Sequence, residues 1–398
     1  MRSYRDLFRT PEFTPFFLSA SAQTVAQTMG GLALGTLVYR ATGSPLLSAV
    51  SMFGSSLVQV LGATFLLSAA DRLPPRAALT ALALLFAVAT AGLALPGLPG
   101  WGLFAIVLAK GLAESVGGGV RWGLLNEILS KDGYVLGRSV FNMMSGLMQI
   151  TGYAAGGALV AVMSPRLSLL TAAALYVLAA VVVRLGLSPR PPRATGRLSA
   201  SATWRANALL WSSPARRQVY LALWIPNGLV VGCESLYVSY APDSAGTLFA
   251  CAALGMLAGD VLVGRVLPRH LRPRLGFPLL LLLAVPYMPF LLHPALPLAA
   301  VAVTVASVGF GASLVQQERL VALTPDALSG HALGLHSAGM LTMQGVAAAL
   351  AGSLAQLTSP ARAMTMMAVG SAGATLLLTV AARREELRTV SCGTGSGG

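Results

Sequence analysis

The chain has 398 residues, of which 55% are hydrophobic and only 10% are charged. A soluble domain is typically about 25% charged, so this deficit and a mean hydropathy of +0.73 exclude an ordinary water-soluble fold. Three cysteines and four histidines, scattered without ligand spacing, predict no disulfide framework, metal site or cofactor. The composition therefore indicates an all-α protein whose main solvent is the lipid bilayer.

Apolar runs of about 20 residues, separated by proline, glycine or charged clusters, predict twelve transmembrane helices. The first run is long enough to span and is expected to be retained. The ninth is the shortest and is interrupted by Pro286 and Pro289. The predicted spans lie near residues 14–39, 45–69, 77–96, 101–128, 138–163, 167–187, 218–240, 245–266, 276–292, 297–316, 332–356 and 361–382.

The net charge of +14 raises the question of nucleic acid as a partner. Most of the 27 basic residues fall in loops that would share one side of the membrane if both termini were cytoplasmic. Arg40, Arg166 and Arg362 fall on the other side. This asymmetry is typical of a multi-pass protein of the plasma (inner) membrane, and it accounts for the charge without nucleic acid.

A Pro-, Ser- and Arg-rich segment divides the chain near its middle and predicts a cytoplasmic linker at 188–217, in which a short interfacial helix is expected. The segment from Arg121 to Leu159 recurs in altered form from Arg319 to Leu354. The predicted domains are therefore an N-terminal six-helix bundle at 1–187 and a C-terminal one at 218–382, followed by a cytoplasmic tail at 383–398.

Three charged residues share one stripe of the predicted fourth span. At about 100° per residue, Glu114 lies about 40° and Arg121 about 20° from Lys110. A charge near the bilayer centre costs at least about 2.5 kcal/mol, so the stripe is expected to face the protein interior. Two interpretations remain open: a substrate or proton site, and a Lys110–Glu114 salt bridge that ties the helix into its bundle. Glu234, with no basic residue nearby in its own span, is predicted to be a protonatable carboxylate.

Two motifs resemble the major facilitator superfamily, and the resemblance extends over essentially the whole chain. The loop "LSAADRLPPRAAL" resembles the family's loop signature, with Asp71, Arg72 and Arg76 in place, although Leu67, Pro74 and Pro75 depart from it. The run "TGYAAGGAL" is similar to a glycine element of proton-coupled exporters, with Tyr153 where proline is usual. Its helix-packing glycines are Gly152, Gly156 and Gly157.

The resemblance implies two six-helix bundles related by a pseudo-two-fold axis along the membrane normal. It also implies a central cleft lined by the first, fourth, seventh and tenth spans. The residues expected in the substrate or proton pathway are Gln23, Gln27, Lys110, Glu114, Asn227 and Glu234. Those expected at a cytoplasmic gate are Asp71, Arg72, Arg76, Arg121, Glu127, Asp260, Arg265 and Arg269.

These features predict a monomeric secondary active transporter, not an enzyme. It would export a small amphipathic molecule, a drug or secondary metabolite, by proton-coupled alternating access, as multidrug efflux antiporters do. An uptake carrier of the same fold and a non-transporting membrane receptor or regulator remain alternatives. No "GxxxxGK[ST]" run indicates a nucleotide-driven pump.

Overall fold

The computed structural model describes residues 4–66, 73–129, 131–192, 200–268, 270–325 and 328–393. Within these ranges the regular elements are all helical. The first half of the chain contains α1 (Tyr4–Arg9), α2 (Phe13–Thr42), α3 (Pro45–Leu66), α4 (Pro75–Leu93), α5 (Gly100–Ile128), α6 (Lys131–Val162) and α7 (Pro165–Gly186). Proline is the first residue of α3, α4 and α7, where its fixed φ favours helix initiation and its missing N–H has no intrahelical partner to lose.

The second half is more often interrupted. Its elements are α8 (Ala200–Ser212), α9 (Pro214–Glu234), α10 (Tyr237–Tyr240), α11 (Ala245–Val261), the π-helix η2 (Leu262–Val266), α12 (Arg272–Ala284), the 3₁₀ helix η3 (Val285–Leu292), α13 (Leu296–Val308), the 3₁₀ turn η4 (Gly309–Gly311), α14 (Ala312–Ala322), α15 (Ser329–Leu357) and α16 (Pro360–Gly393).

Ten helical segments of the described residues are long and apolar enough to cross a membrane. The first two of the twelve predicted spans form α2 and α3, which are not among those ten. Polar side chains on the first half of α2, including Gln23 and Gln27, lower its hydropathy. The predicted ninth span changes from α-helix to 3₁₀ helix at Val285, because Pro286 and Pro289 cannot donate the hydrogen bonds of an α-helix.

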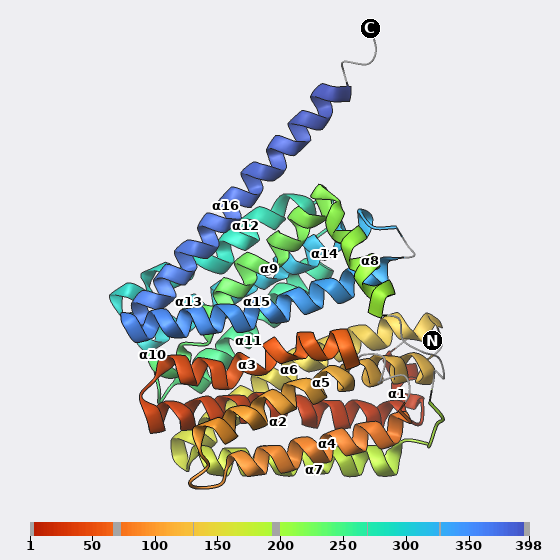
Figure 1. Cartoon of the computed structure of the whole chain (residues 1–398), viewed down its shortest axis with the longest axis vertical. Helices are drawn as coiled ribbons and strands as arrows, with labels where there is room; N and C mark the ends of the chain where they lie inside the picture. The colour runs from red at the N-terminus through yellow and green to blue at the C-terminus, as the bar shows by residue number, and fades with distance from the viewer. Residues whose placement is uncertain are drawn as a thin grey trace.

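A short helix forms in the linker as expected, whereas the last helix is longer than predicted. Helix α8 forms within the predicted linker, and Trp211 of α8 stacks on Trp224 of α9 at a centroid distance of 5.6 Å. Helix α16 continues to Gly393, past the predicted end of the last span at residue 382. In Figure 1 it runs beyond the neighbouring helices toward the C-terminus.

The helices form two groups that follow the two halves of the chain. In Figure 1, α1 to α7 fill the lower part of the molecule and α8 to α16 the upper part. Within the first group α2 packs on α6 and α7, and α3 on α5; within the second, α9 packs on α15 and α16. The contacts between the groups are mainly those of α3 with α15 and of α6 with α11.

Glycines allow the closest approaches between the groups. A Cβ added to Gly157 of α6 would lie 2.8 Å from the Cα of Gly246 in α11, and one added to Gly352 of α15 would lie 2.7 Å from the Cα of Leu46 in α3. Backbone therefore meets backbone at both contacts, as small residues permit between membrane helices.

Polar contacts join the two groups at the end of the molecule where α2 ends and α3 begins. Ser44 donates from Oγ to the Oε1 of Gln356 at 2.8 Å. The Tyr39 hydroxyl donates to the Ser239 carbonyl at 3.5 Å, and Arg40 lies 3.8 Å from Asp243. The Gly157–Gly246 contact, between the C-terminal end of α6 and the N-terminal end of α11, lies at this same end of the molecule. The two groups are therefore closed against each other there.

We expect Gly157→Ala to lower the melting temperature of the purified protein, because the new methyl group would force α6 and α11 apart. Overpacking of this kind costs about 1–3 kcal/mol. Gly334→Ala is the matched control, since a Cβ at Gly334 of α15 meets nothing within 4 Å. Equal melting temperatures for the two variants would show that the glycine contact contributes nothing to stability.

Candidate functional site

Helix α5 carries the three charged residues of the predicted stripe and lies very close to α3. A Cβ added to Gly111 would come within 2.5 Å of the Ser55 carbonyl oxygen of α3, so the glycine is what lets the two helices approach. Lys110, Glu114 and Arg121 follow on the same side of α5 and all line one cavity. Local sequence thus places the charges, and close helix packing brings α3 to them.

The cavity has a volume of about 300 Å³ and lies among α2, α3, α4, α5 and α7. Every residue described as lining it comes from the first half of the chain. Its walls combine apolar side chains such as Leu82 and Phe86 with a polar set: Gln23, Thr24, Gln27, Ser51, Ser55, Gln59, Lys110, Glu114, Arg121 and Tyr176. A small amphipathic molecule would find both kinds of surface here.

Glu114 is half-buried and is held by two carboxamides from different helices. Gln27 of α2 donates from Nε2 to Oε1 of Glu114 at 2.6 Å. Gln59 of α3 donates from Nε2 to Oε2 at 3.0 Å. Each carboxylate oxygen therefore has one neutral donor, and the carboxylate links α5 to both neighbouring helices.

Lys110, one turn before Glu114, turns to a different partner. Its Nζ donates to Oγ1 of Thr90 in α4 at 2.8 Å and lies 5.5 Å from the centroid of the Tyr176 ring in α7. In the described part of the chain the ammonium group and the Glu114 carboxylate form no ion pair of their own. No direct contact between Lys110 and Glu114 therefore supports the salt-bridge interpretation.

Arg121 begins a hydrogen-bonded chain that crosses the first group of helices. Its Nη2 donates to Oε1 of Gln23 at 3.1 Å, and Nε2 of Gln23 donates to Oγ of Ser19 at 3.2 Å. Ser19 in turn donates to the Ala179 carbonyl of α7 at 3.1 Å. The chain fixes the Gln23 amide so that its oxygen faces the guanidinium.

Six polar residues of the site were not predicted from the sequence: Thr24, Ser51, Ser55, Gln59, Thr90 and Tyr176. Ser51, Ser55 and Gln59 are spaced at i, i+4 and i+8, so they share a face of α3. That spacing could have identified Gln59 as a polar residue facing the same interior. Thr90 and Tyr176 carry no comparable signal, because a single threonine or tyrosine in an apolar helix is common.

Asn227 and Glu234, the other predicted pathway residues, are in α9 and do not line this cavity. Asn227 is 1% exposed; its Nδ2 donates to the Leu223 carbonyl at 2.6 Å, and its Oδ1 has no partner among the described residues. Glu234 is 5% exposed, and its Oε1 likewise has no hydrogen-bond partner in the described ranges. The structure thus divides the predicted pathway set between two places.

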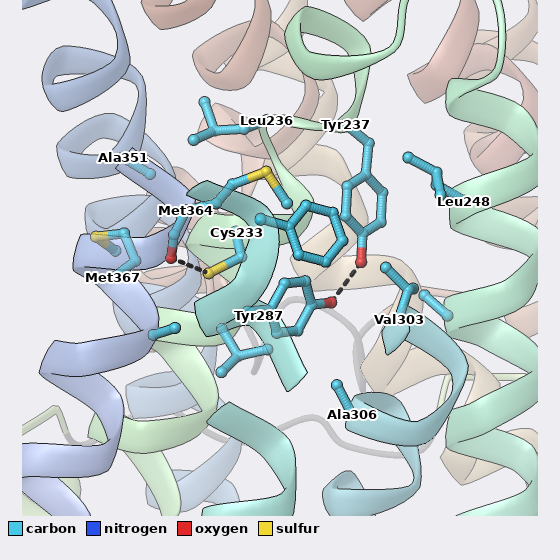
Figure 2. Close-up of a cluster of buried hydrophobic side chains, with 14 of the residues drawn as sticks. Cys233, Leu236, Tyr237, Leu248, Tyr287, Val303, Ala306, Ala351, Met364 and Met367 are labelled. Carbon is cyan, nitrogen blue, oxygen red and sulfur yellow. Dashed lines mark hydrogen bonds between the residues drawn. The ribbon is translucent and has the colours of Figure 1, made fainter. Parts of the chain in front are cut away.

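The surroundings of the C-terminal end of α9 are apolar and aromatic. Figure 2 shows the hydroxyls of Tyr237, in α10, and Tyr287, in η3, pointing toward one another in a hydrogen bond. Cys233, next to Glu234, donates from Sγ to the Met364 carbonyl at 3.3 Å. Glu234 therefore follows directly on Cys233, a member of the largest buried cluster of the described residues, most of which belongs to the second half.

The predicted gate residues are dispersed. Arg76 donates to the Arg184 carbonyl, which joins the start of α4 to the end of α7. Asp260 is exposed on α11, and Arg265 lies in η2. Asp71, Arg72 and Arg269 lie outside the described residues.

Glu127, also predicted at the gate, belongs to a charged cluster at the ends of α2, α5 and α7. Arg190 lies 2.5 Å from Oε2 of Glu12 and 3.7 Å from Oε2 of Glu127. The Ser188 N–H donates to Oε1 of Glu12 at 3.2 Å. Partial burial of Glu12 opposes ionisation, but the Ser188 hydrogen bond and the Arg190 charge outweigh it and lower the pKa of Glu12.

The predicted packing glycines of α6 all meet backbone or side chains closely. A Cβ on Gly152 would lie 1.8 Å from Oγ1 of Thr28, and one on Gly156 would lie 3.0 Å from the Cα of Met29. Both neighbours belong to α2, whereas Gly157 meets α11 of the other half. One short segment of α6 therefore contacts a helix of its own group and a helix of the opposite group.

A sequence model of the Major Facilitator Superfamily matches residues 16–316. This match spans well over half of the chain, and the protein belongs to that family of membrane transporters. No curated protein matches the chain in sequence.

Solved structures of transporters share the fold. A bacterial homologue of the human lysosomal transporter Spinster, in an inward-facing and occupied conformation, has a TM-score of 0.75 at 14% identity, covering 96% of this chain and 98% of its own. A POT family transporter in complex with a thioalcohol-conjugated peptide gives 0.73 at 13%, with 96% of each chain covered. A mutant of the nucleoside transporter NupG gives 0.72 at 13%, covering 92% and 98%. At these identities the likeness shows the fold alone.

The Glu12 cluster yields a prediction of pH dependence. Because the pKa of Glu12 is lowered in the folded protein, its pairing stabilises the fold above the unfolded pKa, near about 4.3, and this contribution is lost as the pH falls through the lower folded value. Arg190→Gln should therefore lower the melting temperature at pH 7, by the equivalent of about 1 kcal/mol or less. The difference from wild type should shrink between about pH 5 and pH 3.

Arg217→Gln, at an exposed arginine of α9, is the control for loss of a positive charge. A wild-type to Arg190→Gln difference that stays constant over this range would show that Glu12 ionisation does not contribute.

Proposed function

We propose that the protein is a secondary active transporter that moves a small amphipathic molecule by proton-coupled alternating access, with Glu114 as the proton-binding group. The observation that carries the proposal is the position of this half-buried carboxylate in the cavity wall, held by Gln27 and Gln59 and near two cations. A carboxylate in such a place can exchange a proton beside bound solute, as intramembrane acids do in transporters.

The fold supports alternating access between two rigid halves. We propose six-helix bundles at 1–187 and 218–382, related by a pseudo-two-fold axis along the membrane normal, with a linker at 188–217 and both termini cytoplasmic. Support comes from the contacts of α3 with α15 and of α6 with α11, which join the groups at one end through glycine. Rocking about these contacts would expose the cavity of the first half to one side and then the other.

The buried carboxylate of Glu234 is proposed as a second protonatable group. It faces an apolar and aromatic cluster, and one of its oxygens has no described hydrogen-bond partner. Protonation would supply the neutral form that such surroundings favour. Asn227, also in α9 and outside the described cavity lining, would move with Glu234.

Two directions of transport are candidates. Export is favoured by the glycine element of α6, which is similar to that of proton-coupled exporters and packs closely against α2 and α11. Uptake is the second candidate, because a proton-coupled carrier of the same fold can also move its solute inward. The plasma membrane and a monomeric state complete the proposal.

The test is flux in proteoliposomes under an imposed pH gradient, with two permanently charged probes, 2-naphthalenesulfonate and 2-naphthylmethyl-trimethylammonium. We expect wild-type protein to move at least one probe in step with a pH signal from trapped pyranine. Glu114→Gln should reduce gradient-driven flux to the level of protein-free vesicles, because the amide cannot take up a proton. The sign of the gradient effect distinguishes export from uptake.

Glu318→Gln is the matched control, because Glu318 is an exposed carboxylate of α14, paired with Arg272, outside the cavity. It should keep the wild-type flux. Wild-type flux in Glu114→Gln would remove Glu114 from the coupling mechanism, and no gradient-dependent flux of either probe would contradict proton-coupled transport of such solutes.

A further inference from the structure

The cavity of the first half holds two cations whose hydrogen-bond partners are neutral. Lys110 donates to the Thr90 hydroxyl and Arg121 to the Gln23 amide oxygen. An ammonium group has three N–H donors and a guanidinium five, so each retains donors for a ligand. Within the described ranges, ion pairs join Arg40 with Asp243, Arg190 with Glu12 and Glu127, and Arg272 with Glu318, all outside the cavity.

The single carboxylate in the described lining offsets only one of the two positive charges, and its hydrogen-bond partners are neutral. Both Glu114 oxygens accept hydrogen bonds from carboxamides, Gln27 on one side and Gln59 on the other. These two contacts hold the carboxylate in the wall beside α2 and α3. Its single negative charge leaves the described lining positive overall.

The remaining elements around the cavity add no charge to the described lining. Helices α2, α3 and α4 contribute amides, hydroxyls and apolar side chains, and α7 contributes the Tyr176 phenol. With Glu114 ionised the lining carries one net positive charge, and with Glu114 protonated it carries two. In a region shielded from water, an excess of positive charge favours an anionic ligand strongly.

We infer that the transported molecule carries an anionic group, a carboxylate, sulfonate or phosphate, which binds at the cavity wall that carries Lys110 and Arg121, while its apolar body lies against Leu82 and Phe86. This inference rests on the proposed transport function and names the chemical class of the solute for the same cavity. Guanidinium and ammonium groups make charge-assisted hydrogen bonds to such oxyanions, and the cavity volume of about 300 Å³ limits the solute to a small molecule.

Protonation of Glu114 and binding of an anion are coupled in this cavity. A proton on Glu114 removes the negative charge nearest to the two cations, so protonation and anion binding favour each other. By linkage the effect is reciprocal. A proton and an anion that stabilise each other on the carrier travel together, which supports uptake as the direction of transport.

The experiment is equilibrium binding to the full-length protein in nanodiscs, followed by naphthalene fluorescence. Three probes share one ring system: 2-naphthalenesulfonate, 2-naphthylmethanol and 2-naphthylmethyl-trimethylammonium. The two charged probes keep their charge at every pH used, so any pH effect reports on the protein. We expect the sulfonate to bind at least about tenfold more tightly than the ammonium probe, as hydrogen bonds to charged groups allow.

Variants locate the effect. Lys110→Gln and Arg121→Gln should each weaken sulfonate binding by about tenfold, and Lys110→Arg, which keeps the charge, should retain it. Glu114→Gln should tighten sulfonate binding, since it imitates the protonated carboxyl. Arg362→Gln, at an exposed arginine of α16 outside the cavity, should bind like wild type. If a glutamine variant of Lys110 or Arg121 does not fold, Lys110→Arg and Glu114→Gln still decide the matter.

Several results would overturn the inference: stronger binding of the ammonium probe, equal binding of all three probes, no binding of the sulfonate, or weaker sulfonate binding in Glu114→Gln. Sulfonate binding that is unchanged in both Lys110→Gln and Arg121→Gln would also overturn it. Gradient-driven flux of the ammonium probe without sulfonate binding would overturn this inference and leave proton-coupled transport intact. Sulfonate binding without any flux would contradict transport and leave anion recognition intact.

Discussion

Lipid provides no water to a charged side chain, and this constraint decides where the few charges inside the helices can lie. Lys110, Glu114 and Arg121 satisfy it by turning inward to a cavity whose other polar residues are neutral. The partners come from three neighbouring helices: Gln27 and Gln23 of α2, Gln59 of α3 and Thr90 of α4. The polar interior and the packing of the first half thus depend on each other.

Close helix packing is the second requirement of this arrangement. Gly111 lets α5 approach the backbone of α3 at Ser55, which brings Gln59 within reach of Glu114. In the same way Gly157 and Gly246 let α6 and α11 meet backbone to backbone between the two halves. The first contact builds the site, whereas the second holds the halves together at the end where α2 gives way to α3. A transporter needs both a stable binding surface and a contact about which its halves can move.

The two halves contribute unequally to the cavity. The described lining of the cavity belongs wholly to the first half, so movement between the halves would leave the binding groups in place and change only their exposure. Glu234 lies in the second half, in apolar surroundings beside Tyr237 and Tyr287. A proton bound there would act on the packing of α9 and not directly on the solute. The two carboxylates therefore lie in different surroundings, one in the cavity wall of the first half and one in the apolar interior of the second.

The sequence by itself determined the membrane-spanning, helical class of the chain and the shared stripe of Lys110, Glu114 and Arg121. Each of these follows from composition or from the period of one helix, which are local properties. It did not predict the change to 3₁₀ helix at Val285 as such, although the two prolines marked the interruption.

Tertiary structure alone decided which side chains meet. That Glu114 binds Gln27 and Gln59, that Lys110 turns to Thr90 and Tyr176, and that Asn227 and Glu234 lie elsewhere all depend on the rotation and separation of helices distant in the chain. Helical periodicity fixes the face on which a residue lies, but it contains no information about which neighbouring helix covers that face. Those choices come from close packing at glycines and from the need of buried polar groups for partners.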